Sequence, residues 1–136
     1  MPTSATPGYA LPIVERFMTA IVEERLDDAR CLLHDEFVAY EAGGLPYSGE
    51  YHGPQGFFDL LAKMTEGMEM TLGPAPQCLL AGDSVAVRSR VTFTSRASGK
   101  SVEMRLVEVY TVRDGLIVEL DVYYKDPSAV AALLDQ

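Results

Sequence analysis

The chain has 136 residues, of which 48% are hydrophobic and 23% charged, a composition typical of one soluble globular domain. Twenty acidic residues against eleven basic ones give a net charge of −9, which disfavours binding to nucleic-acid phosphates or to anionic membranes. Two cysteines are too few for a disulfide framework, and the first residues carry no basic segment of a secretory signal, so a cytoplasmic protein is expected.

The beginning of the chain is expected to be helical. Residues 1–8 are small, polar and proline-rich, as in a flexible N-terminal tail, and residues 9–136 are expected to form one domain. Pro12 suits the first turn of a helix, and apolar residues recur at helical spacing as far as Ile21. A second, shorter helix is predicted from about Asp27, which is a favourable N-cap residue.

A short strand, a loop and a third helix follow. Residues 37–41 have strand character, and residues 42–53 are rich in glycine and aromatic side chains, which favours a loop. Gly53-Pro54 begins the third helix, whose apolar residues include Phe57 and Phe58.

The second half of the chain is predicted to be mainly β-structure. Short turn signals separate the long strands, so antiparallel hairpins are expected, and a short helix follows Pro127. The predicted strands are residues 69–72 and 77–81, separated by Gly73, Pro74 and Pro76, then residues 84–94, 101–112 and 116–124. The fold class is therefore α+β, with the element order α-α-β-α-β-β-β-β.

Strand alternation singles out Glu108. Along residues 101–112 the even positions are apolar apart from this glutamate, which stands between Leu106 and Tyr110. An unpaired buried carboxylate costs several kcal/mol, so such a group pairs or keeps its proton. Two interpretations stay open: an arginine partner or a bulge satisfies Glu108, or it lies in an apolar cavity with a raised pKa and can donate a proton.

Four motifs, in this order and spacing, make the chain resemble the SnoaL-like and ketosteroid isomerase-like group of the nuclear transport factor 2-like superfamily. They are Val14-Glu15-Arg16-Phe17, the run from Leu32 to Glu41, Gly53-Pro54-Gln55-Gly56-Phe57-Phe58 and Asp114-Gly115-Leu116-Ile117. The resemblance covers nearly the whole chain. It implies a cone-shaped fold, in which a strongly bent antiparallel sheet wraps around three helices from the N-terminal half. This cone encloses an apolar pocket. It also implies a homodimer formed through the outer face of the sheet.

The resemblance also implies functional residues. Glu41 stands where the isomerases carry the carboxylate base, and Glu108 falls near their protonated acid. Phe17 occupies the position of their helix tyrosine, so one donor to the substrate oxygen is missing. Asp121 is the nearest match to the acidic residue of the SnoaL-type cyclases and is the alternative acid/base, although its parity sets it on the outer face. The candidate substrate-binding residues are Phe17, Phe57, Phe58, Tyr110, Tyr124 and, at the pocket mouth, His52.

No metal or cofactor is expected. The two histidines have no ligand-like spacing to each other or to cysteine, and no glycine-rich phosphate loop joins a strand to a helix. Two functions stay open. One is a cofactor-independent enzyme, using carboxylate acid/base chemistry to isomerise, cyclise, dehydrate or hydrate a small hydrophobic, cyclic substrate. The other is a non-catalytic dimeric module that binds an apolar ligand or a protein partner.

Overall fold

A computed structural model describes residues 8–135 and contains, within that range, four helices and seven strands. The predicted tail, residues 1–8, lies outside the described residues except for Gly8. The helices are α1 (Ala10–Val22), α2 (Leu26–Arg30), α3 (Gly53–Gly67) and α4 (Pro127–Leu134). The strands are β1 (Leu33–Glu41), β2 (Gly49–His52), β3 (Met68–Leu72), β4 (Gln77–Ala81), β5 (Ser84–Ser95), β6 (Ser101–Arg113) and β7 (Leu116–Tyr124).

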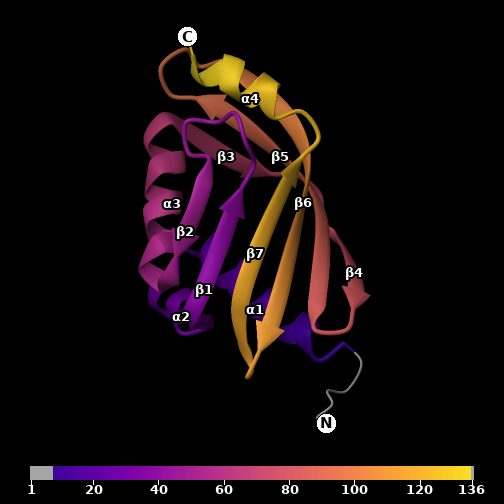
Figure 1. Cartoon of the computed structure of the whole chain (residues 1–136). Coiled ribbons are helices and arrows are strands. Elements are labelled where there is room, and N and C mark those ends of the chain that lie inside the picture. Colours follow the sequence, from indigo (N-terminus) through magenta and orange to yellow (C-terminus); the bar gives the residue numbers. More distant parts are fainter. Residues whose placement is uncertain (1–7, 136) are drawn as a thin grey trace.

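The strands form one curved sheet in the order β2-β1-β7-β6-β5-β3, and β4 pairs with the other half of β5. Figure 1 shows this sheet with its long central strands β7, β6 and β5 and with α4 at one end. The predicted hairpins β5–β6 and β6–β7 are confirmed as antiparallel pairs. The α+β fold class is confirmed, with one difference: β1 and β7 run parallel, so the sheet is not antiparallel throughout.

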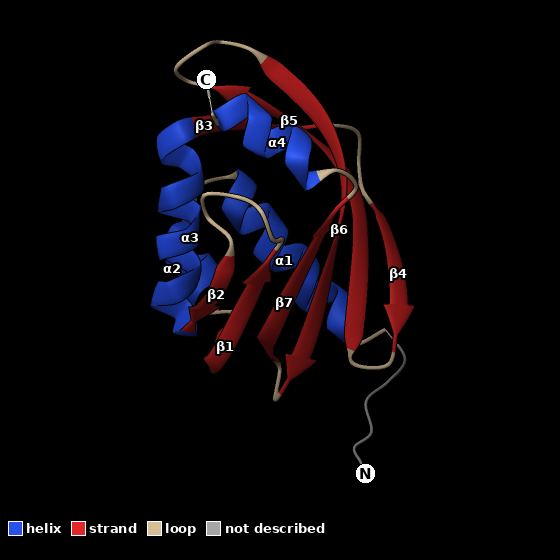
Figure 2. Ribbon diagram, turned by 45° about the horizontal axis from the view of Figure 1, so that its top comes forward, coloured by secondary structure: helices blue, strands red, loops and turns tan. Residues whose placement is uncertain are grey.

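Helices α1, α2 and α3 all lie on one side of the sheet, while α4 crosses its end (Figure 2). Helix α1 faces the sheet with Ala10, Val14, Phe17 and Ala20, which recur every three or four residues and are all buried. Strand β5 buries its odd-numbered residues and β6 its even-numbered ones, as the alternation predicts. The core therefore fills the concave side of the sheet, and the opposite side faces outward.

A bulge changes one of the predicted faces. The register between β6 and β7 shifts after Thr111, so that Val112 pairs with Ile117. Strict alternation along β7 predicts Ile117 on the same side as Asp121, but Ile117 is fully buried because the extra residue turns it inward. Beyond the bulge, Leu120, Val122 and Tyr124 lie on the concave side, as expected.

Several predicted boundaries are wrong. The predicted loop 42–53 contains β2, which pairs antiparallel with β1. By contrast, the two predicted strand segments on either side of Gly73, Pro74 and Pro76 are confirmed as β3 and β4, which pair with different parts of β5. Helix α2 begins before Asp27, so this residue lies in the first turn rather than at the N-cap. Cys31 follows the end of α2 and is exposed. No helix within residues 8–135 is long and apolar enough to span a membrane.

Gly56 fixes the distance between α3 and β2. A Cβ atom at this position would lie 2.8 Å from the carbonyl carbon of Tyr51, too close for any ordinary contact. Although alanine favours helix by about 1 kcal/mol over glycine, Gly56→Ala is expected to lower the free energy of unfolding by about 1–2 kcal/mol net. Urea denaturation checks this. Gly43→Ala is the control, because its Cβ would meet nothing within 4 Å, and equal stability of the two variants would contradict the prediction.

Candidate functional site

The two predicted carboxyl groups lie on one row of the sheet, on its concave side. Tyr40 of β1 pairs with Asp121 of β7, so the next step along these parallel strands brings Glu41 beside Val122. Val122 in turn pairs with Glu108 of β6. Glu41 and Glu108 therefore flank Val122 from the two neighbouring strands, and their Cα atoms are separated by about two strand spacings, or ~10 Å.

Glu108 lies between the buried residues Leu106 and Tyr110, as the alternation predicts. No arginine partner and no outward bulge satisfies it in residues 8–135, and its only pairing is the backbone register with Val87 and Val122. Burial raises the pKa of its carboxyl from 4.5 to about 7. The side chain is nevertheless half-buried rather than closed off.

Glu41 ends β1 and accepts a hydrogen bond of 2.9 Å from the backbone N–H of Ala42. The pKa of this carboxyl is raised to about 7, mainly by burial and in addition by the negative charge of Glu108. The Ala42 amide and the Tyr124 hydroxyl act in the opposite direction, because they stabilise the ionised form. Of the two carboxyls, Glu41 is thus the one whose ionised form is stabilised by hydrogen-bond donors.

A pair of tyrosines lies next to Glu41. The hydroxyls of Tyr47 and Tyr124 are 2.8 Å apart, and the ring of Tyr124 stacks on that of Phe93 with an interplanar angle of 7°. Tyr47 is 2% exposed, although it belongs to the glycine-rich segment before β2. The Tyr51 hydroxyl donates to the backbone carbonyl of Tyr47 at 2.8 Å. Burial is the main cause that raises the pKa of both Tyr47 and Tyr124, so both remain protonated.

Sequence analysis missed Tyr47. It lies in the segment 42–53, which is predicted only as a glycine-rich loop, and only the tertiary contact with Tyr124 shows that its ring turns inward. The available signal is an aromatic residue within a loop that directly follows a predicted catalytic carboxylate.

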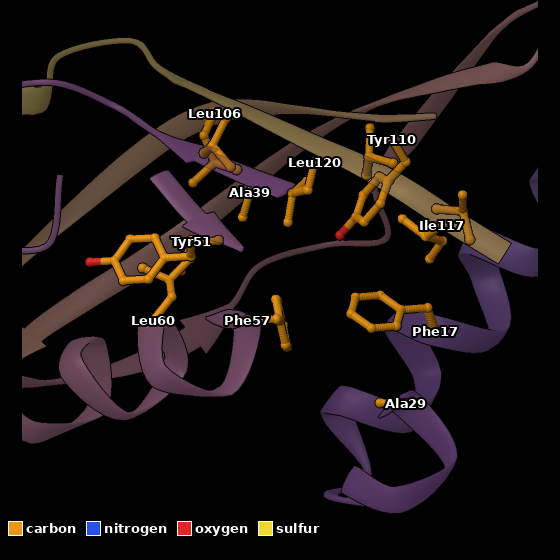
Figure 3. Packing of buried hydrophobic residues seen from close by; sticks show 14 of the residues in the cluster. Phe17, Ala29, Ala39, Tyr51, Phe57, Leu60, Leu106, Tyr110, Ile117 and Leu120 are labelled. Atoms are coloured by element: carbon orange, nitrogen blue, oxygen red, sulfur yellow. The ribbon is translucent and has the colours of Figure 1, made fainter. Parts of the chain in front are cut away.

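Aromatic side chains cover the helix side of the site. The ring of Phe17 makes edge contacts with Phe57 at 5.2 Å and with Tyr110 at 6.0 Å between centroids. All three side chains are buried. Figure 3 shows Tyr110 reaching from its strand toward Phe17 on α1. Phe17, Phe57, Tyr110 and Tyr124 are therefore on the concave side of the sheet, the side on which Glu41 and Glu108 also lie.

Three other predicted site residues lie elsewhere. Phe58 is half-buried, and the guanidinium of Arg30 lies 4.6 Å from its ring centroid, between α2 and α3. The His52 side chain is 68% exposed, with Nε2 3.3 Å from Glu50 Oε1. Asp121 is on the outer face, where it accepts a hydrogen bond of 2.7 Å from the Tyr123 hydroxyl. None of these three side chains belongs to the group formed by Glu41 and Glu108.

Two hollows are found on other parts of the surface. One, of about 520 Å³, is lined by residues of α1, α2 and the segments beside them, including Glu15, Arg25 and Asp28. The other, of about 330 Å³, lies between Pro46 and α4. Neither contains Glu41 or Glu108. Within residues 8–135 no group of three potential metal ligands is found either.

The arrangement supports acid/base chemistry. Two carboxyls with raised pKa values on one face exchange protons near neutral pH, and the charge on one disfavours the charge on the other. The pair therefore passes through a state with one ionised and one protonated member. That state provides a proton acceptor and a proton donor on the two sides of Val122.

Comparison with known proteins gives a consistent family and fold. The model of the SnoaL-like domain family matches residues 14–120. No curated protein sequence matches the chain.

Solved structures share the fold at low sequence identity. An NTF2-like protein from Burkholderia xenovorans has a TM-score of 0.84 and 20% identity, covering 93% of this chain and 97% of its own. TerC, co-crystallised with polyporic acid, has a TM-score of 0.81 and 20% identity, covering 93% and 98%. A candidate polyketide cyclase from Xanthomonas campestris has a TM-score of 0.78 and 17% identity, covering 92% and 96%.

Proposed function

Because the chain belongs to the SnoaL-like domain family, we propose that it is a cofactor-independent enzyme that transfers protons on a small, hydrophobic, cyclic molecule. The reaction would be an isomerisation, a cyclisation, a dehydration or a hydration, each of which begins with proton transfer next to a carbonyl or hydroxyl group. The observation that supports this most is the pair Glu41 and Glu108, both with a raised pKa, on the concave side of the sheet.

In this proposal Glu41 is the general base. Its ionised form is stabilised by the Ala42 amide at 2.9 Å and by the Tyr124 hydroxyl, so it gives up its proton before Glu108. Glu108, which has no donor among the described residues, keeps its proton and donates it, or a hydrogen bond, to an oxygen of the substrate. Protonation of Glu108 also removes the charge that opposes ionisation of Glu41.

The ligand site is part of the proposal. The partly accessible Glu108 side chain, bordered by Tyr110, Leu106 and Val122, supports an apolar pocket on the concave side. Two of the similar structures point to small cyclic molecules by name: TerC was crystallised with polyporic acid, and another is a candidate polyketide cyclase.

We also propose that the protein forms a homodimer through the outer face of the sheet and that it is located in the cytoplasm. The outer face carries charges of both signs, which suits contact between identical surfaces. The charged residues are Arg88, Arg90, Glu103, Arg105 and Glu119.

The exchange of solvent protons into α-tetralone, a hydrophobic cyclic ketone, tests the proposed chemistry. Removal of a proton next to the carbonyl and its return from D₂O incorporate deuterium, which mass spectrometry detects. The rate is expected to pass through a maximum near pH 7, because it requires ionised Glu41 together with protonated Glu108. A rate that equals the protein-free rate at every pH would contradict enzyme function of this kind.

The second candidate is a non-catalytic dimeric module that binds an apolar ligand or a protein partner. Phe17 favours it, since this buried side chain offers no hydroxyl to a substrate oxygen. This candidate predicts that α-tetralone binds, as seen by a rise in melting temperature, without any deuterium incorporation.

A further inference from the structure

A row of three positive charges crosses the outer face of the sheet. Arg90 of β5 pairs with Arg105 of β6, and the backbone N–H of Lys125, just after β7, donates to the Arg105 carbonyl at 2.9 Å. All three side chains are exposed, and none of them forms an ion pair within residues 8–135. Like charges directly opposite one another on neighbouring strands destabilise a sheet. This basic row is therefore unfavourable in an isolated chain.

The acidic residues of the same face gather toward the other end of the strands. Glu119 and Asp121 lie on the outer side of β7, and Tyr40 of β1 stands between Asp121 and Glu50 of β2. We call Glu50, Glu119 and Asp121 the acidic group. Glu119 precedes Lys125 by six residues, which places the two side chains about 20 Å apart along the strand. The outer face thus has a basic end and an acidic end.

Apolar side chains occupy the middle of this face. Val107 and Val109 of β6 are half-buried, and they pair with Tyr123 and Asp121 of β7. Tyr123 is 56% exposed, and Leu79 of β4, on the same face, is 46% exposed. An apolar centre with charged residues around it is the usual composition of a protein–protein interface.

We propose that the outer face binds a second copy of the chain in one orientation, with the basic row of each copy on the acidic group of the other. The inference rests on the proposed homodimer, for which it gives the orientation and the contacts. Two identical sheets packed face to face are related by a two-fold axis that lies between them. An axis that runs across the strands, between the rows of Val107 and Val109, exchanges the basic and acidic ends.

The charges select this axis over the alternative. An axis that runs along the strands would set the basic row of one copy on the basic row of the other, and the like charges would repel. With the axis across the strands, β7 of one copy lies on β7 of the other. Lys125 of each copy then meets Glu119 of the second copy, and the apolar centres meet each other.

Charge reversal tests this orientation. Lys125→Glu and Glu119→Lys are each expected to raise the dissociation constant of the homodimer by about tenfold, because each turns two symmetry-related attractions into repulsions. Analytical ultracentrifugation over a range of protein concentrations measures this constant. Far-UV circular dichroism checks that both variants are folded.

A mixture of the two variants gives the sharpest result. In a heterodimer of Lys125→Glu with Glu119→Lys, a glutamate meets a lysine at both contacts, so the mixture is expected to associate about as strongly as the wild-type protein. Positions 119 and 125 of one chain are too far apart to form an ion pair with each other. Rescue by mixing therefore arises only from contacts between copies.

Lys100→Glu is the matched control. It makes the same change of charge, but Lys100 lies in the turn between β5 and β6, outside the proposed contact. Its dissociation constant is expected to equal that of the wild-type protein. An equal loss of association in Lys100→Glu and Lys125→Glu would overturn the inference, because net charge rather than position would then be responsible.

The other outcomes separate the orientation from the homodimer. Reversal variants that associate like the wild-type protein, or a mixture no stronger than its components, overturn the orientation and retain the homodimer. A Lys125→Glu homodimer tighter than the wild-type one also overturns it, in favour of the axis along the strands. A wild-type protein that is monomeric at every concentration overturns both and leaves the basic row to a different acidic partner. Deuterium exchange into α-tetralone tests the enzyme independently.

Discussion

Replacement of Glu41 by glutamine is expected to lower the rate of deuterium exchange into α-tetralone by about 10²–10⁴-fold, the usual contribution of a general base. Glutamine has nearly the same shape and can still accept the hydrogen bond from the Ala42 amide, so the end of β1 keeps its conformation. What the variant lacks is a group that takes up a proton. Binding of α-tetralone should therefore persist while exchange falls.

Glu50→Gln is the control for this experiment. Glu50 lies on β2, opposite Tyr40 of β1, and its side chain is 58% exposed beside His52. The Glu50→Gln substitution removes one negative charge close to Glu41 but outside the proposed site. This variant should therefore exchange deuterium into α-tetralone at the wild-type rate. If Glu41→Gln also exchanges at the wild-type rate, Glu41 is not the base. If the two variants lose exchange equally, net charge rather than position is responsible.

Glu108→Gln is expected to stabilise the fold at pH 8 but not at pH 4.5. A carboxyl whose pKa is higher in the folded than in the unfolded state binds more protons when folded, so its ionisation costs stability. This cost is absent below pH 4.5, grows as pH rises and is complete above about pH 7. A rise from 4.5 to about 7 corresponds to about 3 kcal/mol. The glutamine side chain of the variant cannot ionise, so the variant does not lose this stability as the pH rises.

Urea denaturation at a series of pH values measures this difference. Glu103→Gln is the matched control, because Glu103 lies on the exposed face of the same strand. The stability difference between Glu108→Gln and the wild-type protein should increase from pH 4.5 to pH 8, and that of Glu103→Gln should not. A difference that stays constant with pH for both variants would show that Glu108 is solvated, and it would remove the proton donor from the proposed mechanism.

The parts of the fold that follow from local patterns were predictable. Period-two alternation identifies the buried faces of β5 and β6, and the Gly53-Pro54 pair marks the start of α3, where Gly53 has a φ of +76°. Glu108 stands out for the same reason, as the one polar member of an apolar row. Each of these signals can be recognised from residues that are close to one another in the sequence.

Features that depend on distant partners were not predictable. Strand β2 has four residues and begins at Gly49 with a φ of +119°, so only its pairing with β1 makes it a strand. The bulge that turns Ile117 inward and the burial of Tyr47 against Tyr124 likewise arise from contacts across the fold. The position of Glu41 was inferred from a family resemblance, and the structure adds its alignment with Glu108 across Val122.

The parallel pairing of β1 with β7 has a consequence for folding. Leu33 is aligned with Ile117 and Tyr40 with Asp121, so strands that are far apart in the sequence must meet before Glu41 stands beside Val122. Closing so large a loop is slow compared with forming the β5–β6–β7 hairpins, whose residues are close in sequence. During synthesis, a ribosome-bound chain that lacks β7 has Glu108 but no neighbour to hold Glu41 opposite it. The two carboxyls therefore come to face each other only after β7 has been synthesised.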